Sequence, residues 1–383
     1  MMRIYFVVNE PSERMFNHFV PSLGNALQKQ GCEVVYGLER LWKNDVLDCD
    51  IVHFQWPEYV FGSHKQKFSD NDITLMTHRL TQLKEKGIKI FVQVHNLKPH
   101  SKKDKNILRL YELLYQHADV IVHMGMYSCE LLQSQYPNAR HVIIPHHIYD
   151  DVYSFNIPQE EARQRLRLPA DKKIILSFGK FRNDNERDFV LSLKKNFYSQ
   201  FSIFNSPLGP KGRFHKAKRL KEFSTVFLMP GFYRETLKTW NPKKLAVRLY
   251  YTCKYKLKGI KFCNDIIPSD LMQCYFCAAD VVLIQRLDIL NSGNLPMAFA
   301  AGKVVVGPKL GNVEQILNET GNYTFDPQDI NSAVDALQMA LKETTKGKRN
   351  KAFATEHWSS DIIAATLLKY YQQAKYKNNE VNR

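Results

Sequence analysis

The sequence predicts an α/β protein made of two doubly wound, parallel-sheet domains. Short apolar segments alternate with amphipathic helical segments along the first 150 residues. The alternation stops over the polar segment 149–173, which contains two prolines, and then resumes. Strands separated by helices in this way form parallel sheets with helices on both faces. The interruption therefore indicates a domain boundary near residues 150–170.

The first half opens with a strand at 3–8, "RIYFVV", followed by an amphipathic helix at 12–31 that Gly31 ends. The apolar runs predict further strands at 32–37, 49–57, 89–96, 119–125 and 141–147. The 3.6-residue periodicity predicts further helices at 74–87 and 105–118. These elements make a domain that we place at 1–155.

The second half repeats the pattern with apolar runs of strand length. We expect strands at 173–179, 223–231, 260–265, 279–285 and 302–308. They belong to a second domain at 170–350, and a final helix and tail at 351–383 follow without another strand. In open parallel sheets the ligand lies beyond the carboxyl ends of the strands, so the residues just after each strand are the candidate site.

Composition excludes several classes of protein. No run approaches eighteen apolar residues, and the first ten residues fit a buried strand better than a secretion signal. Seven cysteines without a framework pattern suit a reducing cytosol, and the CxxC of Cys274 and Cys277 has no second pair to complete a zinc site.

The net charge of +16 is concentrated in one segment. Residues 207–261, interpreted as a basic insertion, carry fifteen Lys and Arg residues against two acids. Such a surface attracts nucleic acid, anionic lipid or a phosphorylated substrate, unless it is simply a solvated insertion. Leu245, Leu249, Tyr250 and Cys253 recur at helical spacing among the lysines, which is typical of a basic amphipathic helix on a membrane surface.

Two strand ends in the second half are suited to binding a diphosphate. "LSFGKFR" ends a strand at Gly179 and then places Lys180 and Arg182 in the loop, where two cations can grip phosphates. About 110 residues later the quartet 291–294, "NSGN", opens a helix of small residues. The free N–H groups of a helix start favour anions, although such a quartet can also be a simple cap.

These motifs resemble the donor domain of GT-B glycosyltransferases. Residues 279–314 resemble the strand–loop–helix–strand–loop–Glu stretch that binds nucleotide sugars in that fold. The segments 50–58, "DIVHFQWPE", and 92–100, "VQVHNLKPH", resemble the bacterial branch that includes β-mannosyltransferases of exopolysaccharide assembly, related to glycosyltransferase families 1 and 4. The resemblance covers nearly the whole chain. It implies an N-terminal acceptor-binding domain, a C-terminal donor domain facing it across a cleft, and a last helix that crosses back to the first domain.

The resemblance assigns roles to the donor residues. It implies that Ser292 and Gly293 contact the diphosphate through backbone N–H groups, and that Lys180 and Arg182 neutralise it as the nucleotide leaves. Glu314 matches the acid that commonly holds the ribose.

The resemblance also places the loop 263–270 near the base of the nucleotide, which it would contact through the main chain of Ile266 or Ile267.

The sequence departs from the family pattern in one respect that bears on the mechanism. Many retaining relatives carry two glutamates seven residues apart, where this chain has Ile289 and Met297. The departure favours an inverting mechanism. The sugar ring is then expected to be held by other groups, Asn291 and Asn294 among them.

An inverting transferase needs a general base to deprotonate the acceptor hydroxyl. Glu58 and His95 both follow strands of the first domain and are the candidates, one as base and the other orienting the sugar. His53 lies inside its strand and is equally explained as a core histidine. Further residues expected to border the acceptor cleft are Asn9, Trp56, Asn96 and His100.

We expect no metal and no cofactor beyond the UDP- or GDP-linked sugar. The lone Asp-x-Asp, Asp48 to Asp50, precedes its strand and so lies at the wrong edge of the sheet. The cluster "PHHIYDD" is better explained as a hinge or acceptor-side loop than as a metal site.

The sequence thus predicts a hexosyltransferase of cell-surface polysaccharide synthesis. Its partners would be a nucleotide sugar, a glycan or polyprenyl-diphosphate-linked acceptor and, through 207–261, the anionic inner face of the membrane, with the enzyme in the cytoplasm. Two alternatives stay open: a nucleotide-sugar epimerase of the same fold, and a polyanion- or nucleic-acid-binding protein that uses the basic segment.

Overall fold

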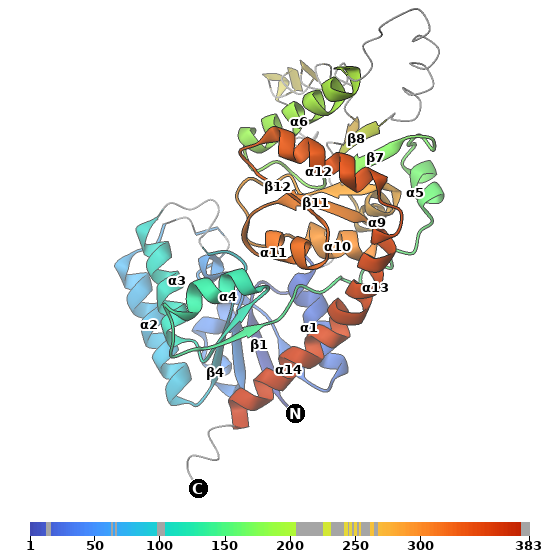
Figure 1. Ribbon diagram of the computed structural model, residues 1–383. Helices are drawn as coiled ribbons and strands as arrows, with labels where there is room; N and C mark the ends of the chain where they lie inside the picture. The colour runs from blue at the N-terminus through green and yellow to red at the C-terminus, as the bar shows by residue number, and fades with distance from the viewer. Residues whose placement is uncertain are drawn as a thin grey trace, which may run out of the picture. The chain divides into compact units, whose positions relative to one another are not determined.

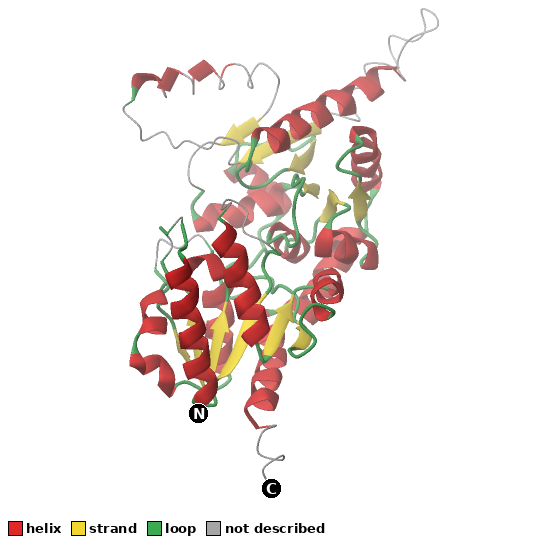
Figure 2. Ribbon diagram, turned by 90° about the vertical axis from the view of Figure 1, so that its left-hand side faces the viewer, coloured by secondary structure: helices red, strands yellow, loops and turns green. Residues whose placement is uncertain are grey.

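The chain folds into two compact α/β units, each built around a six-stranded sheet (Figures 1 and 2). The computed structural model describes residues 1–12, 17–62, 64–65, 67–97, 104–203, 225–230, 241–243, 245–246, 249–250, 253, 261–263 and 267–376. Unit 1 comprises Met1–Val152 and Glu356–Arg383, and unit 2 comprises Tyr153–Thr355. The predicted pair of doubly wound, parallel-sheet domains is confirmed.

The sheet of unit 1 has the strand order β2-β1-β3-β4-β5-β6, and neighbouring strands are parallel. Its strands are β1 Arg3–Val7, β2 Glu33–Val35, β3 Ile51–Phe54, β4 Lys89–Gln93, β5 Val120–His123 and β6 Arg140–Ile143. Its helices are α1 Phe19–Lys29, α2 Asp70–Glu85, α3 Lys105–His117, α4 Met126–Gln133 and α14 Ser360–Tyr376, with short 3-10 turns η1 Leu38–Trp42, η2 Asn44–Asp48 and η3 Pro57–Tyr59.

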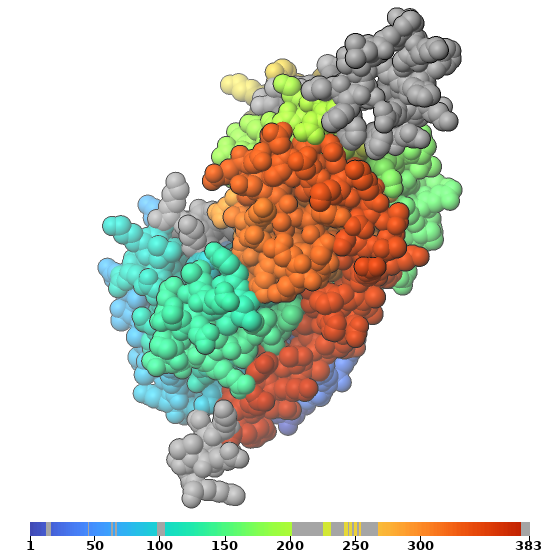
Figure 3. Space-filling view, in the orientation of Figure 1, coloured from blue at the N-terminus to red at the C-terminus, as the bar shows by residue number. Residues whose placement is uncertain are grey.

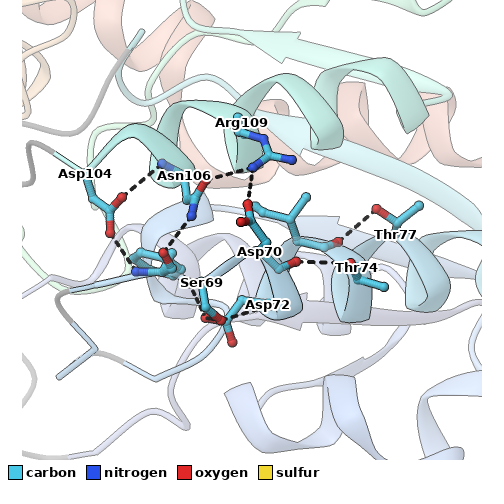
Figure 4. A network of polar contacts seen from close by, with 10 residues as sticks. Ser69, Asp70, Asp72, Thr74, Thr77, Asp104, Asn106 and Arg109 are labelled. Atoms are coloured by element: carbon cyan, nitrogen blue, oxygen red, sulfur yellow. Dashed lines mark hydrogen bonds and ion pairs between the residues drawn. The ribbon is translucent and has the colours of Figure 1, made fainter.

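Polar caps tie the starts of α2 and α3 together (Figure 4). Ser69 and Asp72 form a reciprocal capping box that satisfies free N–H groups at the start of α2. The Asp104 carboxylate accepts from the backbone N–H of Phe68 at 2.7 Å and from that of Asn106 at 3.0 Å. The first turn of α3 is therefore held against the segment that leads into α2.

The C-terminal helix α14 belongs to unit 1, as the resemblance implied, and lies beside α1 (Figures 1 and 3). Ser360, at its start, donates through its N–H to Asp150 at 2.9 Å. Tyr371 is fully buried, its ring lies edge-on to Phe91, and its hydroxyl is 2.6 Å from His53 Nδ1. The helix is thus part of the core of unit 1.

The sheet of unit 2 has the parallel order β12-β11-β10-β7-β8-β9. Its strands are β7 Lys173–Leu176, β8 Thr225–Pro230, β9 Lys261–Cys263, β10 Val281–Leu283, β11 Val304–Pro308 and β12 Tyr323–Phe325. Its helices are α5 Gln159–Arg165, α6 Asp184–Ile203, α9 Ser269–Ala278, α10 Asn294–Ala300, α11 Gly311–Glu319, α12 Ile330–Lys342 and α13 Lys346–Trp358, whose last residues belong to unit 1. Apolar residues of β7, β10 and β11 pack against α6 and α12 in one buried core.

The structure corrects the interpretation of residues 207–261 as one insertion. Strand β8, Thr225–Pro230, lies in the middle of that segment and pairs with β7 and β9, so it is part of the sheet itself. Most of the basic residues lie outside the described residues. Leu245, Leu249 and Tyr250 are described, lie in helical backbone and are exposed.

Candidate active site

The strand order of unit 2 creates a topological switch point between β7 and β10. From β7 the chain passes to β8 on one side, whereas β10 lies on the other side. The loops after β7 and β10 therefore diverge at the carboxyl edge, which leaves a crevice suited to a ligand. The two loops singled out in the sequence, 177–183 and 284–294, are these two.

The loop after β7 turns at Gly179, whose φ is +95°, in the region that favours glycine. Its N–H donates to the carbonyl of Pro230 at 3.1 Å, which fixes the turn against the end of β8. Lys180 is exposed and Arg182 is half-buried just beyond the turn. Lys180 and Arg182, the predicted pair of cations, therefore follow a turn at the switch point that a hydrogen bond to β8 holds in place.

The loop after β10 is tied directly to the loop after β7. The carbonyl of Phe178 accepts from Asn294 Nδ2 at 2.9 Å and from Gln285 Nε2 at 3.2 Å. Gln285 is fully buried and Asn294 is the first residue of α10. Asn294, predicted as a sugar contact, thus joins the two loops through its side-chain nitrogen.

Arg286 is a member of this cluster that the sequence interpretation missed. Its Nη1 lies 2.6 Å from Glu186 Oε2 and donates to the carbonyl of Lys180 at 2.8 Å. The same Glu186 oxygen accepts from the N–H of Arg182, whose Nη1 donates to the carbonyl of Asp288 at 2.9 Å. Burial, together with nearby Arg286, lowers the pKa of Arg182.

The charge balance of this cluster suits an anion. Lys180, Arg182 and Arg286 bring three cations to the switch point, and the Glu186 carboxylate forms an ion pair with Arg286 and accepts a hydrogen bond from the backbone N–H of Arg182. Glu186 is only 2 % exposed, so it serves to hold the arginines and is not itself presented to solvent. Arg286 is the one basic residue of "LIQRLD", just after β10, but nothing in the sequence indicates that it contacts Glu186, one hundred residues earlier.

The quartet 291–294 is braced from the other side by the start of α11. Asn312 is fully buried, and its Nδ2 donates to Asn291 Oδ1 at 2.8 Å. The backbone N–H of Leu295 donates to the carbonyl of Ser292 at 3.2 Å, and Gly293 immediately precedes α10. All four residues of the quartet are half-buried.

The other two donor predictions lie apart from the bonded cluster. Glu314 is half-buried in the first turn of α11. Ile267 is half-buried just before α9, and residues 264–266 lie outside the described residues. Their roles at ribose and base stay predictions.

In unit 1 the ends of β3 and β4 bring Trp56 and His95 together. The two rings are stacked, with centroids 4.2 Å apart and planes 16° apart. Gln55 Oε1 lies 2.9 Å from His95 Nε2 and accepts a hydrogen bond from its N–H, so Nδ1 carries the lone pair. Burial, and then the neighbouring His146 and His53, lower the pKa of His95 well below its ordinary value. His95 is therefore a neutral imidazole at pH 7.

Glu58, the other candidate base, is held elsewhere. It lies in η3, is 6 % exposed, and its Oε2 accepts from the Tyr111 hydroxyl of α3 at 2.6 Å. Burial and the adjacent Glu58 raise the pKa of Tyr111, so this hydroxyl remains a donor. The structure therefore joins Glu58 to α3 and joins His95 to Trp56 and Gln55.

The remaining acceptor-side predictions are placed as follows. Asn9 is exposed just after β1, and Asn96 is half-buried just after His95. His100 lies outside the described residues. Because β1 lies between β2 and β3, the switch point of this sheet lies between β1 and β3. Asn9 follows β1 and Trp56 follows β3, so both come after strands that flank the switch point.

Phe19 gathers further histidines that the sequence interpretation did not assign to the site. The centroid of its ring lies 5.1 Å from the ring centroid of His95, 4.7 Å from that of His146 and 5.0 Å from that of His147. His147 is fully buried and donates from Nε2 to the Phe19 carbonyl, while the Tyr149 N–H donates to its Nδ1. Because both of its nitrogens contact backbone groups, His147 ties the segment after β6 to the start of α1. The role of this segment as a hinge or acceptor-side loop stays a prediction.

Solved structures of other proteins are similar to nearly the whole chain. A sucrose-phosphate synthase from Thermosynechococcus elongatus is 15% identical, with 97% of this chain and 99% of that chain covered and a TM-score of 0.67. Anabaena HepE in complex with UDP is 10% identical, with 97% and 100% covered and a TM-score of 0.65. An α,α-trehalose-6-phosphate synthase from Burkholderia multivorans is 12% identical, with 100% and 99% covered and a TM-score of 0.62.

The protein has the GT-B fold. These neighbours are glycosyltransferases, and HepE has also been solved with UDP-glucose. No protein-family model matches the sequence, and a comparison with curated proteins finds no match. None of the helices among the described residues is long and apolar enough to cross a membrane.

Proposed function

We propose that the protein is a glycosyltransferase that moves a hexose from a UDP- or GDP-linked donor to a glycan or lipid-linked saccharide. One observation carries the proposal: Asn294 and Gln285 tie the Gly179 loop to the quartet loop at the switch point of unit 2. The two loops that resemble a donor site thus form one bonded unit beside a cluster of cations. A fold alone does not establish an activity, so the proposal rests on this site.

In this proposal unit 2 binds the donor and stabilises the leaving group. Lys180 and Arg182 neutralise the diphosphate, with Arg286 holding the Lys180 backbone, and the N–H groups of Ser292 and Gly293 hold its oxygens. These fixed cations supply the positive charge that a divalent metal supplies in other transferases, so we propose a metal-independent reaction. Glu314 and Ile267 would contact the ribose and the base.

Unit 1 supplies the base, and we propose His95 for that role. Gln55 Oε1 accepts a hydrogen bond from the Nε2–H of His95, and in this proposal Nδ1 takes the proton of the acceptor hydroxyl. The hydroxyl oxygen then bonds to the anomeric carbon as the bond from that carbon to the diphosphate breaks, which inverts the centre. Trp56 stacks on His95 and orients its ring, whereas Glu58, buried against Tyr111, positions α3.

The donor-ring positions disfavour the epimerase alternative. An epimerase needs an acid or a base beside the sugar ring, whereas Ile289 and Met297 are apolar and only 7 % and 8 % exposed. Asn291 and Asn294 are amides that can hold hydroxyls but not exchange protons at neutral pH.

We also propose that the enzyme works in the cytoplasm, on the inner face of the membrane. Leu245, Leu249 and Tyr250 form an exposed apolar face in a segment rich in lysine, and each cation near an anionic surface contributes about 1 kcal/mol. Sedimentation with vesicles tests this: anionic vesicles should retain the protein and neutral ones should not. Equal binding to both would refute the membrane proposal without affecting the transferase proposal.

Calorimetry with a panel of nucleoside diphosphates tests the donor site. One of UDP or GDP should bind, equally well with chelator present, and Lys180→Ala should weaken binding by about tenfold or more. Lys195→Ala is the matched control, because Lys195 is an exposed lysine further along α6. Binding of neither nucleotide, or equal loss in both variants, would refute the assignment.

A transfer assay tests the base separately. His95→Ala should abolish sugar transfer and leave nucleotide affinity unchanged, because His95 lies in unit 1. Proton NMR of the product should show the anomeric configuration inverted relative to the donor. Retention of configuration, or full activity in the variant, would contradict the role of His95.

A further inference from the structure

A cluster of nitrogen and sulfur side chains lies in unit 1 apart from the donor loops. His123 ends β5, His141 lies in β6 and Cys129 lies in α4, the helix that covers this part of the sheet (Figures 1 and 3). Their ligand atoms all lie within 4.8 Å of one another, and among the described residues this is the one such group of three. His123 is fully buried, Cys129 is 8 % exposed and His141 is half-buried, which leaves one side of the cluster open to solvent.

The hydrogen bonds fix the orientation of both imidazoles. His141 Nε2 lies 3.0 Å from the Tyr136 carbonyl and must donate to it, so Nδ1 carries the lone pair. That lone pair lies 2.9 Å from His123 Nε2. The other nitrogen of His123, Nδ1, lies 3.1 Å from the Ser128 hydroxyl, which also contacts the Gly125 carbonyl. Each histidine is therefore oriented by a partner on its far side, as histidine ligands of metals are.

We propose that His123, Cys129 and His141 bind one zinc ion, with water at the fourth position. Zinc prefers imidazole nitrogen and thiolate sulfur in tetrahedral geometry, with bonds of about 2.0–2.3 Å, so its ligand atoms are about 3.3–3.6 Å apart. The present separations, from 2.9 Å to at most 4.8 Å, span that range. The three side chains need only small shifts to admit the ion.

Binding releases one proton. Cys129 binds as thiolate and its thiol proton goes to solvent, while His123 moves its proton from Nε2 to Nδ1 so that Nε2 can bind the ion. The Ser128 hydroxyl then accepts from Nδ1 and donates to the Gly125 carbonyl. Zn²⁺ with one thiolate and two neutral imidazoles gives the site a net charge of +1, on its solvent-exposed side, and no further reactant is required.

The ion ties α4 to the last two strands of the unit 1 sheet. Strand β6 is an edge strand, and the chain continues from it into the segment that contains His146 and His147. The ion would therefore stabilise the edge of the unit 1 sheet at the strand that leads into this segment. It takes no part in the metal-independent transfer, so this inference does not depend on the proposed function.

Cobalt titration of the chelator-treated full chain tests the site directly. A Cys253→Ser background removes an exposed thiol that would bind metal unspecifically. One equivalent of Co²⁺ should produce the visible bands of tetrahedral cobalt and a near-ultraviolet thiolate-to-cobalt band, and one equivalent of Zn²⁺ should abolish both. Cys129→Ser should remove the thiolate band.

Two further variants keep the test decisive. Cys49→Ser, the matched control, changes a buried thiol of unit 1 that donates to the Val46 carbonyl, and should retain the band. Ser128→Ala keeps every ligand and should weaken cobalt binding by about 10- to 100-fold. If Cys129→Ser fails to fold, His141→Gln at the half-buried position should weaken binding instead. Absence of a thiolate band, or a band unchanged in Cys129→Ser or His141→Gln, would overturn the proposal.

Discussion

Removing the Arg286 guanidinium should destabilise unit 2 by leaving a buried carboxylate without its main counter-charge. In Arg286→Met the side-chain length is kept, but the 2.6 Å ion pair with Glu186 and the hydrogen bond to the Lys180 carbonyl are lost. Glu186 is 2 % exposed, so water cannot replace the lost partner, and the Arg182 N–H remains its neighbouring donor.

The size of the effect follows from the burial of the pair. Breaking a buried pair by removing one partner costs about 3–5 kcal/mol, and we expect the lower end because the Arg286 side chain is 15% exposed. Neutralising the acid as well, in Arg286→Met with Glu186→Gln, should recover about 2 kcal/mol, because the uncompensated charge is gone. The two substitutions should therefore be strongly non-additive.

Urea denaturation of the full chain, with hydrogen exchange of α6 as a local probe, measures both quantities. The matched control is Arg187→Met, since Arg187 pairs on the surface with Asp184 and Asp188, and exposed pairs contribute at most about 1 kcal/mol. Nucleotide affinity should fall in Arg286→Met because the Lys180 backbone is released. Equal costs for Arg286→Met and Arg187→Met, or additive effects in the double variant, would refute the reasoning.

Three further outcomes are expected. Gly347→Ala should lower the melting temperature of unit 2, because the new methyl carbon would lie 2.2 Å from the Gly302 carbonyl oxygen, and relieving such a clash costs about 1–3 kcal/mol; an unchanged melting temperature would contradict this. Gly179→Ala has room for the methyl group but an unfavourable φ of +95°, so we expect a cost of about 1–2 kcal/mol and weaker nucleotide binding, measured by calorimetry against wild type. Stability should fall as pH drops below 6.5: burial lowers the pKa of His53 and of His146 to about 3, so the folded state stays neutral while the unfolded chain takes up protons. At pH 5.5 each histidine should cost about 1.4 kcal/mol, and a flat urea midpoint between pH 7 and 5 would exclude this effect.

The strands were predictable because each is a short apolar run set off by polar turns. Every strand of unit 1 overlaps a predicted range, with β6 starting one residue earlier at Arg140, and in unit 2 the exception is β12, Tyr323–Phe325. Three residues are too few to show a period, and the pairing of β12 with β11 depends on contacts that form only in the sheet. The start of α1 at Phe19 was not predictable for the same reason, because it depends on a contact of the folded chain: the Asn17 side chain accepts a hydrogen bond from the Phe19 N–H.

The candidate site was predictable where loop chemistry is local. Gly179 with its following cations, and the polar quartet, were visible because their residue types are unusual at strand ends. Arg286 was not, since its importance lies in a contact with Glu186 across one hundred residues. The stacking of Trp56 on His95 was also hidden, because it joins two strands that lie side by side only in the folded sheet.

Burial has opposite effects on charge in the two candidate sites: it accompanies an ion pair in unit 2 and keeps a histidine neutral in unit 1. In unit 2, the buried Glu186 carboxylate forms an ion pair with Arg286 and accepts from the backbone N–H of Arg182, so it fixes the positions of two cations at the switch point. In unit 1, burial and neighbouring imidazoles lower the pKa of His95, which keeps that ring neutral and able to accept a proton. A transferase requires this difference, because the leaving group gains negative charge while the acceptor hydroxyl loses a proton. This difference in polarity is the physical reason for proposing that unit 2 binds the donor and that unit 1 supplies the base.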